Sequence, residues 1–196
     1  MTGWTRRRLL RAAAAGGAIA GGGAALTAGS GGNTLLAAPS VDTDARILNF
    51  FLLLEYLQET LYRDGLEHGG LTDELAAYAR TVGPQETEHA AYLVKRLGAR
   101  ARPRPKADFG AALSSSERFQ AAAIDLEETA IAAYIGQAAN LTRGAVGAVG
   151  TLLSVEARQA AWLRSLAGAP PAPRAADPAR KPSDVLAHLR SQGLVS

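Results

Sequence analysis

The sequence of 196 residues contains no cysteine, and this absence excludes several kinds of chemistry at once. Disulfide bonds, thiol catalysis, cysteine-ligated metal sites and lipoprotein attachment all require a thiol group. Aromatic residues are also scarce, at 6%, whereas alanine is abundant, which suits closely packed helices. No segment shows the alternation of apolar and polar residues that is typical of a half-buried strand. We therefore expect an all-α protein without thiol chemistry.

The positive charge of the chain is concentrated at its N-terminus. Arg6, Arg7, Arg8 and Arg11 are the only charged residues among residues 1–38. The net charge therefore falls from +3 for the whole chain to −1 for the part that follows this segment. Because that part has no basic excess, we do not expect nucleic acid as a partner.

Residues 1–38 have the pattern of a secretory signal, in which arginines precede a weakly apolar stretch and small residues follow. The run Thr5-Arg6-Arg7-Arg8-Leu9-Leu10 resembles the twin-arginine export signal of bacteria. We expect an exported protein, extracytoplasmic or secreted, with no stable membrane span after signal removal. Cleavage after Ala28, Ser30 or Ala38 fits the pattern equally well. A disordered basic tail is the alternative for this segment.

Four long helices are predicted within a domain of residues 41–168. Apolar residues recur at helical spacing in each of them, so each has a side that needs burial. The predicted helices span about 45–64, 84–97, 115–139 and 145–167. A connector rich in Arg and Pro links the second helix to the third, and a short turn links the third to the fourth. This order is typical of a four-helix bundle with a long connection between helices 2 and 3.

Two features flank or interrupt this pattern. Gly83-Pro84 predicts either a kink in a longer second helix or a fresh helix start. Residues 169–196 form a proline-rich tail in which about 183–190 look like one short amphipathic helix. We expect that helix to dock on the bundle.

An internal repeat of glutamates runs through the four predicted helices. Leu54-Glu55-Tyr56 on the first helix has a near-copy in Leu126-Glu127-Glu128 on the third. The second helix carries Glu86 and His89 three residues apart, and the fourth carries Glu156 and Gln159 at the same spacing. Such a repeat predicts two related halves of one architecture.

A carboxylate on the apolar side of a helix is costly, because burying it without a partner costs several kcal/mol. For one such glutamate, a position at the rim or a partner arginine is the simpler explanation. Four glutamates in two matched pairs are better explained by divalent cations held between them. Glu86 and His89 lie on one side of their helix and can bind one ion together. Oxygen ligands with one or two imidazoles favour iron or manganese over zinc or copper.

The chain resembles the ferritin-like superfamily over about residues 45–168, and within it the secreted, desiccation-related bacterial group. Four segments carry the resemblance: Ile47-Leu48-Asn49-Phe50, Leu54-Glu55-Tyr56-Leu57, Glu127 with Ala133-Tyr134, and Val155-Glu156-Ala157-Arg158. The fold that this resemblance implies is the same four-helix bundle. Its implied centre holds two metal ions between the helices.

The resemblance also implies a role for each predicted ligand. Glu55 and His89 would be terminal ligands of one metal, Glu86 and Glu156 would bridge, and Glu127 would be the terminal carboxylate of the second metal. Gln159 stands where the group usually has a second histidine, and an amide is a poorer ligand for iron. Three outcomes are open: an asymmetric di-metal site, a single-metal site, or a retained fold without metal. The predicted metal ligands are Glu55, Glu86, His89, Glu127, Glu156 and Gln159.

Two functions follow from these outcomes. The first is a metal-dependent oxidoreductase of the ferroxidase or peroxide-scavenging type, acting in oxidative or desiccation stress. The second is a metal-free scaffold with a structural or stress-related role in the envelope. Several residues are expected to lie outside the site. They are His68, a solvated His188, the surface or ion-pair residues Glu88 and Glu128, and the core aromatics Tyr62 and Tyr134.

Overall fold

The computed structural model describes residues 39–195, and within this part of the chain every regular element is helical. The all-α prediction is therefore confirmed. The predicted export signal lies in residues 1–38, outside the described residues. The elements are α2 (Val41–His68), α3 (Asp73–Leu97), η1 (Gly98–Arg100), η2 (Gly110–Ser114), α4 (Ser116–Gln137), η3 (Ala138–Asn140), α5 (Arg143–Leu166) and α6 (Pro182–Ser191).

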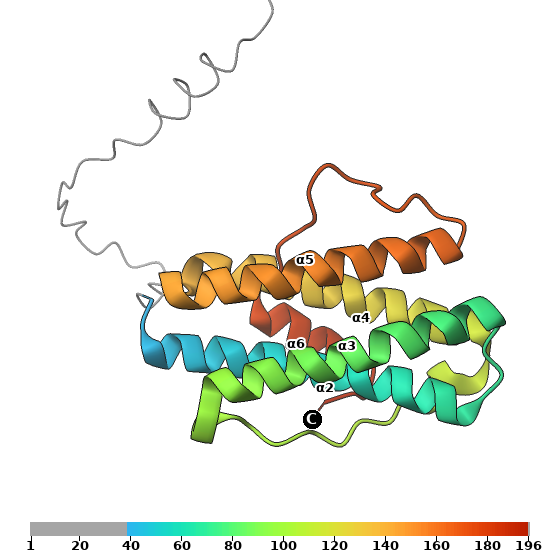
Figure 1. Cartoon of the computed structure of the whole chain (residues 1–196), viewed down its shortest axis with the longest axis horizontal. Helices are drawn as coiled ribbons and strands as arrows, with labels where there is room; N and C mark the ends of the chain where they lie inside the picture. Colours follow the sequence, from blue (N-terminus) through green and yellow to red (C-terminus); the bar gives the residue numbers. More distant parts are fainter. Residues whose placement is uncertain (1–38, 196) are drawn as a thin grey trace, which may run out of the picture. The chain divides into compact units, whose positions relative to one another are not determined.

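The four long helices α2 to α5 lie side by side as a bundle (Figure 1). A tight turn at Gly69-Gly70, both with positive φ, reverses the chain between α2 and α3. The segment 98–115, with η1 and η2, then runs back along the bundle, so that α4 runs in the same direction as α3. A short turn with η3 reverses the chain again into α5. This arrangement confirms the predicted bundle with a long connection between its second and third helices.

Two helices are longer than the sequence indicates. α2 begins at Val41, where the Ser40 side chain caps it by accepting a hydrogen bond from the Thr43 N–H at 3.1 Å. α3 continues through Gly83 and Pro84 as one helix, so of the two predicted alternatives the longer second helix is observed and the fresh start is not. Its buried residues lie on both sides of the proline and pack on the core, which holds the helix together. A Cβ at Gly83 would lie 3.3 Å from Tyr62 Cβ, so glycine permits the close approach of α3 to α2 here.

The basic connector between α3 and α4 is mostly exposed but is tied to α2 at several points. The Asn49 side chain donates to the Arg100 carbonyl at 2.9 Å and accepts from the Arg102 N–H at 2.8 Å. Arg104 pairs with Glu59 at 2.6 Å, and its guanidinium lies 4.2 Å from the centroid of the Tyr56 ring. These contacts hold the connector against the bundle.

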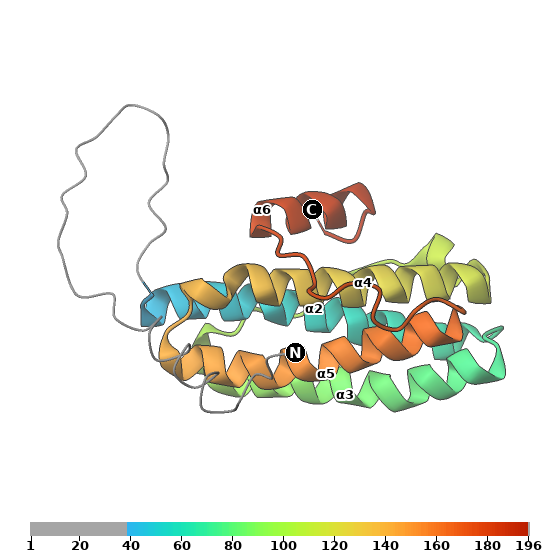
Figure 2. The same cartoon turned by 90° about the horizontal axis from the view of Figure 1, so that it is seen from above.

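The C-terminal helix α6 packs on the side of the bundle opposite α3 and α5 (Figure 2). Its Val185 and Leu189 are completely buried. The chain leading to it passes close to α4, where the Arg180 N–H donates to the Ala132 carbonyl at 2.9 Å. Gly136 makes room for this passage, because a Cβ there would overlap the Arg180 carbonyl oxygen. The docked short helix agrees with the expectation from the sequence.

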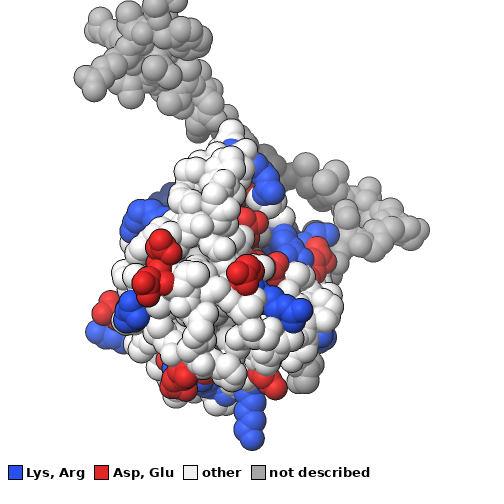
Figure 3. Space-filling view, turned by 90° about the vertical axis from the view of Figure 1, so that its right-hand side faces the viewer, with Lys and Arg blue, Asp and Glu red and all other residues white. Residues whose placement is uncertain are grey.

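The surface is mixed in charge where Figure 3 shows it. Lys and Arg side chains alternate with Asp and Glu over this face of the molecule. None of the helices within residues 39–195 is both long and apolar enough to cross a membrane.

Candidate metal centre

Each of the four long helices places one glutamate in the interior of the bundle. They are Glu55 on α2, Glu86 on α3, Glu127 on α4 and Glu156 on α5, and each is 0% exposed. An ionised carboxylate buried without a partner costs several kcal/mol, so four of them require compensation by protons, donors or cations.

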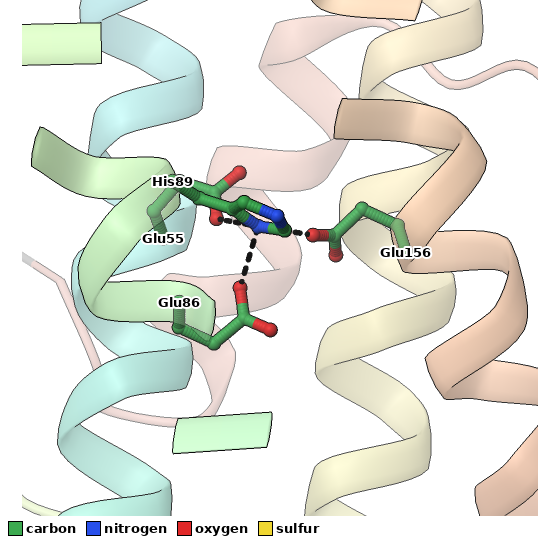
Figure 4. A group of neighbouring side chains, drawn as sticks. All are labelled: Glu55, Glu86, His89 and Glu156. Carbon is green, nitrogen blue, oxygen red and sulfur yellow. Dashed lines mark hydrogen bonds and ion pairs between the residues drawn. The ribbon is translucent and has the colours of Figure 1, made fainter. Parts of the chain in front are cut away.

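Three of these glutamates converge on one ring nitrogen of His89 (Figure 4). His89 Nδ1 lies 3.0 Å from Glu156 Oε1, 3.1 Å from Glu86 Oε2 and 3.3 Å from Glu55 Oε2. One N–H cannot satisfy three carboxylates at once. Two of the converging oxygens, on Glu55 and Glu156, accordingly have no hydrogen-bond donor among the described residues.

The other oxygen of each converging carboxylate is held by a neutral donor. The pairs are Tyr134 hydroxyl to Glu55 Oε1, Gln159 Nε2 to Glu86 Oε1 at 2.7 Å, and Gln58 Nε2 to Glu156 Oε2 at 2.9 Å. Each carboxylate is thus fixed from behind and turns its remaining oxygen toward a common point. This arrangement would orient the three carboxylates as ligands of an ion.

Glu127 lies beside this cluster and is bound differently. The Tyr62 hydroxyl donates to its Oε1, and Gln58 Nε2 donates to its Oε2 at 3.0 Å. Both oxygens of Glu127 are therefore engaged, whereas each converging glutamate presents one oxygen to His89.

In the metal-free protein, the pKa values of the centre are shifted toward the protonated forms. Burial, reinforced by the charge of Glu156, raises the pKa of the carboxyl groups of Glu55, Glu86 and Glu127. Burial alone would lower the pKa of His89, but the carboxylates of Glu156, Glu55 and Glu86 beside its Nδ1 outweigh burial and raise the pKa to about 12. A divalent cation at the common point would displace these protons.

The residues present fit a hard or borderline divalent cation. Four potential ligand atoms, one each from Glu55, Glu86, His89 and Glu156, lie within 4.8 Å of one another, and all four residues are buried. Three oxygens and one imidazole nitrogen suit iron or manganese. The oxygens of Glu55 and Glu156 that have no hydrogen-bond donor are acceptors, so a cation placed between them could satisfy both.

Comparison with known families decides the classification. Residues 43–169 match the family model of the ferritin-like domain. The chain belongs to the ferritin-like superfamily. No curated protein matches the sequence significantly.

The ferritin-like centre is reached from the surface between α3 and α5. A cavity of about 370 Å³ lies there, lined by residues of both helices that include His89, Gln159 and Trp162. His89 is 7% exposed and Gln159 is 3% exposed, whereas the four glutamates are fully buried. An ion or small oxidant would therefore meet the imidazole side of the centre first.

The ferritin-like bundle brings four of the six predicted ligands into one cluster: Glu55, Glu86, His89 and Glu156. Glu127 and Gln159 lie next to it and are joined to it by hydrogen bonds through Gln58 and Glu86. Whether any of the six binds metal stays a prediction.

Most residues expected outside the centre do lie outside it. Glu88 is exposed, and Glu128 pairs with Arg164 at 2.9 Å. His188 also lies outside the centre and is partly exposed as expected, but its Nε2 lies 2.8 Å from Asp125 Oδ2 in the contact between α6 and α4. The docking of α6 brings His188 to Asp125, a pairing that the sequence of the tail alone does not show.

Three residues of the centre carry roles that the sequence analysis missed. Tyr62 and Tyr134 are core aromatics as predicted, but their hydroxyls also bind site carboxylates. Gln58 was not singled out, although it is completely buried and donates to two glutamates. A signal was present, because Gln58 follows Glu55 at the spacing that separates Glu156 from Gln159.

Proposed function

We propose that this ferritin-like protein is exported and binds iron or manganese at the centre formed by Glu55, Glu86, His89 and Glu156. One observation carries the proposal: three buried carboxylate oxygens and one imidazole nitrogen are turned toward a common point, and two of the oxygens have no hydrogen-bond donor within residues 39–195. Ligands held in place by second partners are typical of metal sites in proteins.

Bound iron or manganese would supply redox chemistry toward oxygen or peroxide. The chain's own residues would hold the ion, with Tyr134, Gln159 and Gln58 orienting the carboxylates from behind. The α3–α5 cavity would admit small oxidants while the bundle excludes larger molecules. We propose oxidative or desiccation stress protection outside the cytoplasm as the role, in keeping with the resemblance of residues 1–38 to an export signal and of the bundle to the secreted, desiccation-related group.

A metal-free scaffold is the second candidate. The observation that favours it is that amide N–H groups of Gln58 and Gln159 satisfy oxygens of Glu86, Glu127 and Glu156 without any cation. Against it stand the retained acids, because replacing buried charged groups by apolar residues is often neutral or stabilising.

Elemental analysis of the protein purified from its native export route tests the proposal. We expect at least one iron or manganese ion per chain, and loss of that metal in the Glu55→Ala, Glu86→Ala double variant. The matched control is Glu88→Ala, which removes an exposed carboxylate from α3 and should retain the metal.

Two results would contradict the proposal. Sub-stoichiometric metal in both the unaltered protein and the double variant would favour the scaffold. A purified chain that still begins at residue 1 and is found only in the cytoplasm would contradict export.

A further inference from the structure

We infer that the centre holds a single divalent ion, because the Gln58 amide occupies the position between Glu127 and Glu156 that a second ion would need. The inference rests on the proposed metal-binding function and narrows it. It concerns the half of the centre that contains Glu127, Glu156 and Gln159, where the ferritin-like pattern predicts a second metal.

The first step is the position of Gln58. Its side chain leaves α2, is 0% exposed, and lies between a glutamate of α4 and a glutamate of α5. Nε2 is 3.0 Å from Glu127 Oε2 and 2.9 Å from Glu156 Oε2. An amide NH₂ group has two hydrogens to donate, and both are used here. The amide thus joins these two carboxylates as a bridging cation would, but without a charge.

The second step is the state of Glu127. Its remaining oxygen accepts a hydrogen bond from the Tyr62 hydroxyl, so both of its oxygens already have a neutral donor. A cation bridging Glu127 and Glu156 would have to displace the amide and leave its donors unpaired in a buried site. Leaving a buried donor unsatisfied costs about 1–3 kcal/mol.

The third step concerns Gln159, which resembles Gln58 in its bonding. Its Nε2 donates to Glu86 Oε1 at 2.7 Å and to Gln85 Oε1 at 3.0 Å. The two glutamines together place neutral donors where the second half of the centre would otherwise need positive charge. Gln159 in place of a histidine is therefore only part of the reason why the two halves of the centre differ, and Gln58 is the residue that limits the centre to one ion.

The number of bound ions tests the inference. The full chain is dialysed against Mn(II), and bound manganese is measured per chain. We expect one ion in the unaltered protein and two in Gln58→Glu, because this change removes both donors and adds a carboxylate between Glu127 and Glu156. The matched control is Gln137→Glu, which makes the same change at a buried glutamine near the end of α4 and should leave one ion.

A second variant and a spectroscopic measurement test the same inference independently of Gln58→Glu. Gln58→Ala removes the donors without adding charge, and we expect it also to admit a second ion. Electron paramagnetic resonance separates an isolated Mn(II) ion from an exchange-coupled pair, so we expect the isolated signal in the unaltered protein and the coupled signal in the Gln58 variants.

The outcomes separate this inference from the function on which it rests. Two ions in the unaltered protein would overturn the inference and leave metal binding intact. One ion in the unaltered protein and still one in both Gln58 variants, with native circular dichroism, would overturn the role of Gln58. No manganese or iron in any of these proteins would overturn the proposed function together with the inference.

Discussion

Replacing Tyr134 by phenylalanine isolates one hydrogen bond of the centre. Tyr134 is completely buried on α4, and its hydroxyl donates to Glu55 Oε1 across the bundle. Its ring stacks on Phe51 with centroids 4.2 Å apart, and a phenylalanine would keep that contact. The substitution therefore removes a donor without opening a cavity larger than one oxygen atom.

The expected loss of stability in Tyr134→Phe follows from the buried carboxylate of Glu55 that remains. Glu55 already has one orphaned oxygen, and the variant leaves its second oxygen buried without a donor as well. Such a loss costs about 1–3 kcal/mol of unfolding free energy. At roughly 2–4 °C per kcal/mol for a domain of this size, the chelated protein should melt about 4–8 °C lower for a loss of about 2 kcal/mol. Affinity for Mn(II) should fall about 10- to 100-fold, as is typical when a ligand loses its orienting partner.

Thermal melting of the chelated protein and Mn(II) titration measure the two effects separately. Tyr62→Phe removes the equivalent donor from Glu127, so it should lower stability by a similar amount but leave the affinity of the Glu55 cluster unchanged. Tyr56→Phe, which keeps its ring beneath Arg104, is the control for the substitution itself. Melting and affinity in Tyr134→Phe that match this control would refute the proposed orientation of Glu55.

Three further effects can be measured on the same protein. Gly136→Ala should lower the melting temperature and expose the proline-rich tail to limited proteolysis, because its Cβ would overlap the Arg180 carbonyl. Gly147→Ala is the control on α5, where a Cβ would meet nothing within 4 Å, and it should raise the free energy of unfolding by about 0.5–1 kcal/mol. Equal effects at both sites would contradict the close passage of the tail. The pKa values of three site carboxyl groups and of His89 are higher in the folded protein than in the unfolded chain, so the folded protein binds protons more tightly. The free energy of unfolding of the chelated protein should therefore fall as the pH rises above 4.5, the ordinary pKa of a glutamate side chain. The stabilisation by Mn(II), measured as the difference in melting temperature between loaded and chelated protein, should accordingly grow with pH, and a difference that shrinks would show that protons do not compete with the ion.

Much of the fold could be predicted because it depends on local signals. Apolar periodicity located the four helices, and the Arg- and Pro-rich segment located the long connection. The errors lie where tertiary packing overrides a local signal. Pro84 does not end α3, because the buried residues before and after it pack on the same core. His188 is only partly solvated, because α6 docks beside Asp125.

The sequence by itself determined that four helices each carry one glutamate on the buried side, and that a histidine follows one of them at the spacing of a shared ligand. Helical periodicity locates such residues to one side of a helix, since residues three or four apart are neighbours there. It does not say which oxygen of a carboxylate faces which partner. That depends on the rotation of each helix and on the side chains of the other three, which pack at close to crystal density.

Only the tertiary structure therefore decided that Glu55, Glu86, His89 and Glu156 share one point while Glu127 does not. It also decided that Gln58, Tyr62 and Tyr134 belong to the centre, since their partners lie 65 to 98 residues away in the chain. The spacing within one helix can mark such a residue, as it does for Gln58, but it does not identify the partner across the bundle. In the packed bundle the two matched halves seen in the sequence become unequal: Glu55, Glu86, His89 and Glu156 turn ligand atoms toward one point, whereas Gln58 and Tyr62 donate hydrogen bonds to the two oxygens of Glu127.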